Sequence, residues 1–556
     1  MRASTLLSQS TSLHLSSLTS VQTGTSHTYT GLALALMAAL TSMSAFAENN
    51  PNTPVIPQYP NVKVENQVHA GGNNETVYVE FGPNATTGLV QFEGNTDINV
   101  SQNSHGIKIV GVSSKGSSTS GNRAPDLTLE FGSLNQSLNQ PGGTTNVTVS
   151  KDTGILVDSA QSNVSYRGSV NFIVQENSAL NVTNNSKGST DQQTGVTKPI
   201  ADAIELRVED TEAGSANDIK VDFAGTGKIE TKGGAGFYLL QSGQGNIDMH
   251  LSDKVLIDAN GKGHAHHHLS NHGINAIVQE SSSTPETNIN KGYINIVSGA
   301  QIHVDGDQTS GIYARNLSGD INIITTDAQA IHANGNQSSG IEIRASEGST
   351  VVQNAAGIVL NDPNNVNPDY VPTQTTEAHG INVFVGELQL LDKTDKYNYK
   401  DAYLGNGTGT VLIQNQGQIT AHGTDGIGIL VNRGGSAQNE QTSRREKPST
   451  AISIANSGHL NLLGNGSAGI VVNNKNASKE GVMIVNSGLL TLRGGSTTGI
   501  KVFNAHGDIA IQNTGSIEIT KPTTTLKTIS NAQQPIDNPP PLLKHLGFTP
   551  LLLMGM

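Results

Sequence analysis

The sequence predicts an all-β fold, a parallel β-helix (β-solenoid) with three short strands in each coil. Three observations predict this fold. One sequence motif recurs along the chain, and its short segments alternate apolar and polar residues. Gly, Asn, Ser, Thr and Asp stand between these segments. Alternation with period two turns one face of a strand inward. The intervening residues tolerate left-handed backbone or bond their own backbone in turns. A repeat of this kind is the signature of stacked coils.

The clearest anchor of the repeat is a small residue followed by Ile and then by an alternating strand. Successive anchors stand 29 to 49 residues apart, and the short spacings show the unit without insertions. The anchors are Gly106-Ile107, Gly154-Ile155, Gly273-Ile274, Gly311-Ile312, Gly340-Ile341, Gly380-Ile381, Gly426-Ile427, Gly469-Ile470 and Gly499-Ile500, with looser copies at Ala203-Ile204 and Gly236-Phe237.

The segment that begins at Gly311 shows one complete unit. It predicts strands over Ile312–Ala314, Ile321–Ile323 and Ile331–Ala333. Because one coil cannot cover its own inner face, stacked coils are expected to bury one continuous column. With strands about 4.8 Å apart, roughly fifteen to twenty coils would form a rod on the order of 70–100 Å long.

Four asparagines recur at one position of the unit. Each follows an Ile by two residues and precedes a Gly by two, which places it at the end of a strand. In stacked coils their amides would lie above one another and bond to each other and to turn backbone. We interpret them as a stabilised corner and not as a row that binds a ligand. They are Asn415, Asn456, Asn486 and Asn513.

The composition excludes several classes of function. The 556 residues include 62 Gly but no Cys and no Trp, and 14% are charged. Low charge density with regularly spaced Ile, Val and Leu is unlike a disordered chain. Without Cys there are no disulfides, thiolate zinc sites or Cys nucleophiles. A net charge of -13 argues against a nucleic-acid partner, which would require a basic face.

The first 47 residues are predicted to be a signal peptide. The apolar run Leu32–Leu40 is followed by Ala45-Phe46-Ala47, an A-x-A cleavage pattern. The run is too short for a permanent membrane span. A short buried helix is the alternative, and a true start downstream of Met1 would explain the long stretch before the run. Export through the inner membrane is therefore predicted.

Three further segments are expected after the signal peptide. Residues 48–68 hold four prolines, which disfavour helix and central strand, so an extended lead-in is predicted. Residues 69–520 carry the β-helix repeat. Residues 521–556 are Pro-rich, with Pro539 to Pro541 in succession, and are expected to be a disordered tail.

The repeat grammar "GDIxI-x-N-x-G-x-I-x-A-x-G-x-x-S-x-GI", from about Gly106 to Ile519, resembles the passenger domains of Gram-negative autotransporters (type V secretion). The resemblance implies a right-handed β-helix, adhesin-like, on the outer membrane surface or released from it. It also accounts for the missing Cys, because a passenger crosses the outer membrane unfolded. The grammar stops near Ile519 without a translocator barrel. The chain is then a truncated product, uses a separate outer-membrane translocator, or is exported another way.

The segment "GKGHAHHHLSNHG" is the most conspicuous local feature. Neutral imidazoles bind zinc, nickel or copper, but this tract stands between two predicted strands, so a solvated loop is the preferred interpretation. The histidines that precede a Gly are interpreted as corner residues. The tract holds His264, His266, His267, His268 and His272, and the His-Gly pairs stand at His105, His272, His379, His422 and His506.

A polysaccharide-active β-helix enzyme, lyase or hydrolase, is the alternative from another functional class. Such enzymes gather carboxylates on one face, and the richest acidic segment, "IELRVEDTEAGSANDIKVD", has no matching cluster on neighbouring coils. G-x-S-x-G, phosphate-loop and calcium-nonapeptide motifs are absent. No catalytic, metal or cofactor residue and no cofactor is therefore assigned. The acidic residues are Glu205, Glu209, Asp210, Glu212, Asp218 and Asp222.

Two insertions interrupt the repeat, and loops on a rigid scaffold are where contacts are made. Exposed Tyr suits contact with glycan or protein. The predicted function is an exported, non-enzymatic, adhesin-like passenger that binds a host or bacterial cell-surface protein or glycan. A truncated, unanchored passenger is the second alternative. Function is expected at His264–His272, at Glu387–Gly409, which holds Tyr397, Tyr399 and Tyr403, and at Arg433–Thr450, which holds Arg444, Arg445 and Lys447.

Overall fold

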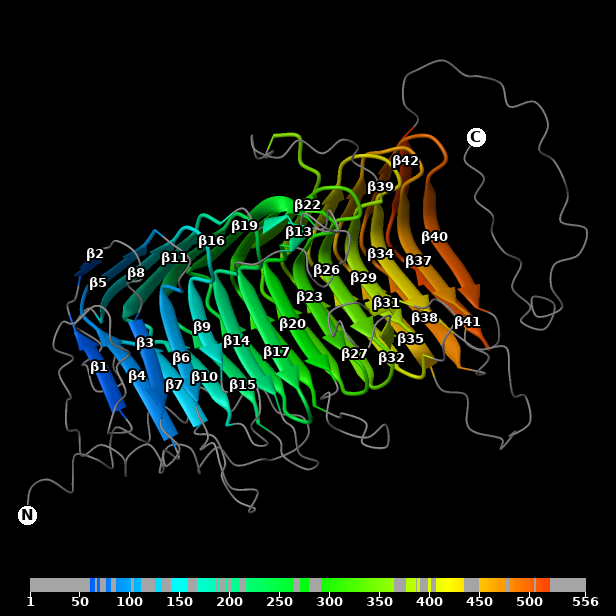
Figure 1. The fold of residues 1–556 in the computed structure, drawn as a ribbon. Coiled ribbons are helices and arrows are strands. Elements are labelled where there is room, and N and C mark those ends of the chain that lie inside the picture. Colours follow the sequence, from blue (N-terminus) through cyan, green and yellow to red (C-terminus); the bar gives the residue numbers. More distant parts are fainter. Residues whose placement is uncertain are drawn as a thin grey trace, which may run out of the picture. The chain divides into compact units, whose positions relative to one another are not determined.

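The computed structural model is a right-handed parallel β-helix with three strands in each coil, as predicted (Figure 1). No described segment is helical, so the described chain offers no helix able to span a membrane. The signal peptide and the tail expected at 521–556 lie outside the described residues. These are 61–520 without 66–67, 71–76, 82–86, 102–104, 112–125, 133–141, 159–167, 187–188, 191–196, 199–201, 210–216, 264–270, 280–291, 365–376, 387, 391–398, 402–406, 435–449, 476–479 and 505–506.

Three sheets of parallel strands, called A, B and C, make up the walls. Sheet A consists of β3 (Val77–Phe81), β6 (Ile107–Gly111), β9 (Ile155–Asp158), β14 (Ile204–Glu209), β17 (Phe237–Ser242), β20 (Ile274–Gln279), β23 (Ser310–Asn316), β26 (Ser339–Ala345), β29 (His379–Val385), β34 (Ile427–Arg433), β37 (Ala468–Asn474) and β40 (Thr498–Asn504). Sheet B consists of β1 (Asn61–Glu65), β4 (Thr87–Glu93), β7 (Asp126–Phe131), β10 (Val170–Val174), β15 (Ile219–Phe223), β18 (Ile247–Leu251), β21 (Ile294–Ser298), β24 (Ile321–Thr325), β27 (Ser349–Asn354), β32 (Thr410–Asn415), β35 (Thr450–Asn456), β38 (Gly481–Asn486) and β41 (Ile509–Asn513). Sheet C consists of β2 (Val68–Ala70), β5 (Thr96–Val100), β8 (Gly143–Val149), β11 (Ser178–Asn184), β16 (Thr226–Thr231), β19 (Val255–Gly263), β22 (Gln301–Asp307), β25 (Ala330–Asn334), β28 (Gly357–Leu360), β33 (Ile419–Ala421), β36 (Leu460–Leu462), β39 (Leu490–Arg493) and β42 (Ile517–Thr520).

The chain passes through sheets B, C and A in turn, so each passage makes one coil. Among the described residues this gives 13 strands in sheets B and C and 12 in sheet A. Twelve steps of about 4.8 Å make a stack of roughly 60 Å. The predicted number of fifteen to twenty coils was wrong, because insertions lengthen many coils and fewer coils use the same length of chain. The first strand begins at Asn61, inside the expected lead-in, and the last ends at Thr520.

The unit predicted from Gly311 is confirmed strand by strand. Strands β23, β24 and β25 contain the three expected segments, and all the small-residue anchors lie in sheet A. One anchor was shifted by two residues. Ile381 of β29 pairs with Ile429 of β34, so the equivalent glycine is Gly428 and not Gly426. The sequence "GIGIL" contains two Gly-Ile pairs in succession, and the second one is in register with the anchor of β29.

The anchor glycines form a column that has no room for a side chain. A Cβ atom on Gly311 would lie 2.3 Å from Cγ2 of Ile331 and 2.8 Å from the carbonyl oxygen of Gly340. Gly340 meets Gly380 in the same way, and Gly380 meets Gly428. The repeat therefore keeps glycine where sheet A begins, because the inward Ile of sheet C packs directly against this backbone.

The asparagine ladder is confirmed and is longer than predicted. Nδ2 of Asn415 donates to Oδ1 of Asn456 at 2.7 Å, and the same bond joins Asn456 to Asn486 and Asn486 to Asn513. Each Nδ2 also donates to the carbonyl oxygen of the residue two positions on, at 3.0–3.1 Å. Asn354 adds a rung at the other end, 2.8 Å from Asn415. These amides stabilise the corner after sheet B.

The core is one apolar column inside the coils. Its amino-terminal half is filled by phenylalanines from sheets A and B. Ring centroids of neighbouring pairs lie 5.1 to 6.5 Å apart, a normal range for aromatic packing. Further on, Ile, Val and Leu fill the same space. The phenylalanines are Phe92, Phe131, Phe172, Phe223 and Phe237.

Candidate functional site

Sheet A is where the regular coil is interrupted. From β10 onward, each connection from sheet B to sheet C has only two to four residues. The long connections in this part of the chain all enter or leave sheet A. The three segments predicted to carry function follow this rule, because one precedes β20, one follows β29 and one follows β34. The candidate functional site is therefore sheet A together with the connections at which its strands begin and end.

The two predicted insertions after β29 and β34 come together on the side of sheet A where its strands end. Nη2 of Arg433 lies 3.3 Å from the carbonyl oxygen of Thr408 and 2.7 Å from Oε2 of Glu480. The Arg433 side chain is only 1% exposed. This buried guanidinium ties together the roots of three connections that leave sheet A.

Much of the two insertions lies outside the described residues. The residues that are not described include Tyr397, Tyr403, Arg444, Arg445 and Lys447. Tyr399 belongs to a two-stranded antiparallel hairpin, β30 (Leu388–Leu390) and β31 (Tyr399–Asp401), that the sequence analysis did not predict. A second hairpin, β12 (Ser189–Thr190) with β13 (Thr197–Lys198), is a separate two-stranded sheet in the connection from β11 of sheet C to β14 of sheet A.

His272 lies at the opposite edge of sheet A, where strands begin. It is fully buried, its Nδ1 accepts the backbone N–H of Ser310 at 2.9 Å, and its ring stacks on Tyr313 with centroids 4.6 Å apart. His105 precedes β6, and His379 is the first residue of β29, at the register position equivalent to His272. His422 directly follows β33 of sheet C, also at a corner. His506 and His264 to His268 lie outside the described residues.

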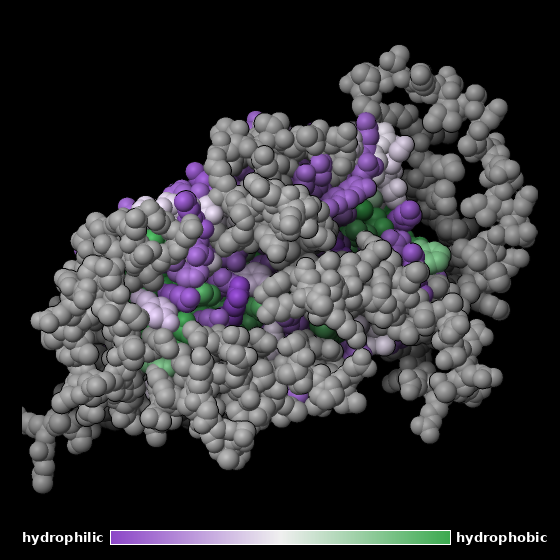
Figure 2. Space-filling model, viewed as in Figure 1, coloured by the Kyte–Doolittle hydropathy of each residue, from purple (hydrophilic) through white to green (hydrophobic). Residues whose placement is uncertain are grey.

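The outward face of sheet A is buried along its middle strands. Every residue of β17, β20 and β23 is buried, so both faces of these strands are covered. Tyr238, Leu240, Ile277 and Tyr313 pack together on the outward side, where they are 2–7% exposed. Figure 2 shows hydrophobic residues interspersed with hydrophilic ones on the face that carries sheet A in Figure 1. The sequence signal that was missed is the absence of alternation in "GFYLLQ" and "INAIVQ".

A buried ion pair follows the apolar group on the same face. Oε1 of Glu342 accepts from Nε and Nη2 of Arg344 at 2.9 and 2.6 Å, and Oε2 accepts from Oγ of Ser310 at 2.7 Å. Glu342 is fully buried, and the guanidinium lies 5.4 Å from the ring centre of Phe384. Burying charge without a partner is strongly unfavourable, so these bonds hold the face in one arrangement.

The acidic segment does not assemble on one face. Glu205 lies on the outward side of sheet A with Arg207, and it accepts from Oγ1 of Thr153 at 3.2 Å. Asp218 and Asp222 belong to the corner and outward face of sheet B, where Asp218 accepts the backbone N–H of Asn246 at 3.0 Å. The side chains of Glu209, Asp210 and Glu212 are not among those described. No converging set of carboxylates forms from the described members.

The carboxyl group of Asp202, just before β14 at the start of sheet A, has a strongly raised pKa. Burial raises the pKa of Asp202 to about 8, and the nearby carboxylate of Glu205 acts in the same direction. The Oδ1 atom of Asp202 accepts the backbone N–H of Ala235 at 2.6 Å, which opposes the rise. Asp202 therefore joins two coils at the start of sheet A in its protonated form at neutral pH.

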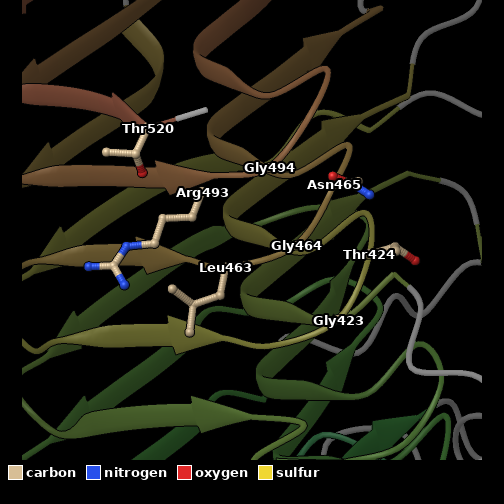
Figure 3. Close-up of a pocket in the computed structure, with 8 residues that line it drawn as sticks. All are labelled: Gly423, Thr424, Leu463, Gly464, Asn465, Arg493, Gly494 and Thr520. Atoms are coloured by element: carbon tan, nitrogen blue, oxygen red, sulfur yellow. The ribbon is translucent and has the colours of Figure 1, made fainter. Parts of the chain in front are cut away.

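A pocket of about 440 Å³ lies at the corner between sheets C and A in the last coils (Figure 3). Stacked glycine turns form one side, and Arg493 is the only charged residue of its lining. Across the described residues no group of three or more His, Asp or Glu is arranged to hold a metal ion. The lining residues are Gly423, Thr424, Leu463, Gly464, Asn465, Arg493, Gly494 and Thr520.

The described geometry is that of a rigid scaffold whose polar groups are engaged in holding the coils together. Its distinctive region is sheet A, with long connections at both edges and aromatic and ionic side chains on its outward face. Comparisons with protein-family models, with curated proteins and with solved structures find no match to the chain.

Proposed function

We propose that the protein is an exported, non-enzymatic β-helix that binds a protein or glycan on the surface of a host cell or of another bacterium. The connections that enter and leave sheet A make the contacts. The observation that supports this most directly is that, from β10 onward, the long connections all gather at sheet A while the turns between sheets B and C stay at two to four residues. A rigid scaffold that carries its variable loops on one side is a common arrangement for binding.

The construction of sheet A suits such a role. Stacked coils present an extended surface, which solenoid proteins use for macromolecular ligands. Tyr238, Tyr313 and the Glu342–Arg344 pair are buried, so they hold the base of the site in place. Arg433 joins the roots of neighbouring connections in the same way. Binding then depends on the connections themselves. Because the residues at which they join sheet A are already ordered, less conformational entropy is lost on association.

The cellular setting in this proposal comes from the sequence. The apolar run before Ala45-Phe46-Ala47 supports export, and the absence of Cys suits a chain that crosses the outer membrane unfolded. The β-helix fold is compatible with an autotransporter passenger on the cell surface or released from it. A separate translocator in the outer membrane would be its partner in secretion.

The test measures binding of the exported chain to cells and to arrayed glycans. In two variants, residues 435–449 and residues 391–398, both at sheet A, are each replaced by a short Gly-Ser linker. The matched control replaces residues 133–141, a long connection between β7 and β8 of sheets B and C. Circular dichroism shows whether each variant keeps its β structure.

We expect at least one sheet A variant to bind about tenfold more weakly, a loss of about 1.4 kcal/mol, and the control variant to bind like the parent. Equal binding by all three variants would overturn the assignment to sheet A. Release of sugars from polysaccharides by the parent chain would replace the proposal with the enzymatic alternative.

A further inference from the structure

Two histidines lie side by side on the outward face of sheet C, away from the proposed binding face. His303 of β22 and His332 of β25 are paired in register on adjacent strands. Their ring centroids are 4.6 Å apart, and the rings are tilted by 72°. Both residues are half-buried. Neither residue was singled out in the sequence, because 29 residues separate them.

The two rings continue a row of titratable side chains across the sheet. Asp258 of β19 is in register with His303, and Glu230 of β16 is in register with Asp258. Nδ2 of Asn260 donates to Asp258 at 2.7 Å, and Nζ of Lys228 lies 2.6 Å from Glu230. Two acidic side chains therefore lie in register on the two strands that precede the imidazole pair in sheet C.

The surroundings of the two imidazoles favour the neutral form of each ring. Burial lowers the pKa of His303, and burial together with His303 lowers the pKa of His332, against the opposing effect of Asp362. A neutral imidazole offers one nitrogen lone pair to a metal ion. Nε2 of His303 lies 3.1 Å from Nε2 of Gln301, whose amide N–H can only donate. The buried Nδ1 of His332 has no hydrogen-bond partner in the described part of the chain.

We infer that His303 and His332 together bind one divalent transition-metal cation, of the class of Zn²⁺, Ni²⁺ or Cu²⁺, with water completing the coordination. Imidazole nitrogen is a favoured ligand for these ions. Rotation about the side-chain bonds brings a nitrogen of each ring to the metal, since neighbouring parallel strands lie only about 4.8 Å apart. Asp258 lies in register with His303 on the next strand. The site is independent of the proposed ligand-binding role of sheet A.

The histidine tract at His264 to His268 would obscure this site in any measurement. The parent for the test is therefore the full exported chain with His264, His266, His267 and His268 replaced by Asn. Zn²⁺ and Ni²⁺ are titrated by calorimetry, and Cu²⁺ by electron paramagnetic resonance, which reports the number of coordinating nitrogens. The variants are His303→Asn, His332→Asn and the double change. His250→Asn, on the outward face of sheet B beside Asp222, is the matched control.

We expect the parent to bind one equivalent of metal with two imidazole nitrogens in the Cu²⁺ spectrum. Each single variant should bind at least about tenfold more weakly, because the loss of even an outer partner of a metal ligand has an effect of that size. The spectrum of each should show one imidazole. The control variant should match the parent. Absence of saturable binding by the parent, or unchanged binding by the double variant, would overturn the inference.

Discussion

Replacing Asn456 with Ala should destabilise the coils around β35 by about 3 kcal/mol. The side chain is 1% exposed and makes three hydrogen bonds. Its Nδ2 donates to Asn486 at 2.7 Å and to the carbonyl oxygen of Gly458 at 3.1 Å, and its Oδ1 accepts from Asn415 at 2.7 Å. A buried hydrogen bond contributes about 1 kcal/mol net, and partners left without water raise the loss. Because each coil contacts only its neighbours, the effect should reach β32 and β38.

Guanidinium unfolding followed by far-ultraviolet circular dichroism measures this change. Asn461→Ala is the matched control, because Asn461 lies one strand further along the chain on the outward face of sheet C and is only half-buried. The control should change the free energy of unfolding by less than about 0.5 kcal/mol. If Asn456→Ala also stayed within that limit at an unchanged slope, the ladder would not be a stabilising element and the corner would need another explanation.

Two further changes test other parts of the scaffold. Gly311→Ala places a Cβ atom 2.3 Å from Ile331, whereas Gly357→Ala meets nothing nearer than 3.8 Å. Overpacking of this kind typically reduces stability by about 1–3 kcal/mol, so the midpoint of thermal unfolding should fall clearly for the first variant only, and equal midpoints would contradict the glycine column. Asp202 has a folded pKa of about 8, above the usual value of 3.8, so the folded protein keeps a proton that the unfolded chain releases between these values. The free energy of unfolding should therefore decrease as the pH rises from about 4 to about 8, and Asp202→Asn should flatten that slope. A variant with the same slope as the parent would show that Asp202 does not set it.

The β-helix was predictable because its physical basis is local and repeated. Alternation around Ile321 and Ile331 gives strands, and glycine before Ile312 gives the close contact between sheets. The asparagine ladder followed from spacing alone, since identical offsets in stacked coils fall at one corner. The count of coils was wrong because insertions of variable length hide the period. The choice of Gly426 was wrong because two Gly-Ile pairs stand in succession.

The candidate sites were only partly predictable, because stacking joins residues that are distant in sequence. Arg433 and Glu480 are 47 positions apart, and His303 and His332 are 29 apart. The register between such residues depends on how many residues each insertion holds outside the coil. The sequence alone does not show which residues of neighbouring coils are paired. Burial of Tyr238 on the outward face of sheet A was predictable in principle, because its strand lacks the alternation of a strand with one exposed face.

The placement of long connections at sheet A has a practical consequence for protein engineering. From β10 onward the turns between sheets B and C have only two to four residues, whereas the adjacent strands β29 and β34 are each followed by a long connection. Peptides grafted after these two strands would be anchored about 4.8 Å apart, and each further strand would add the same increment. The solenoid can therefore serve as a molecular ruler on which pairs of epitopes or enzyme fragments are mounted at chosen separations.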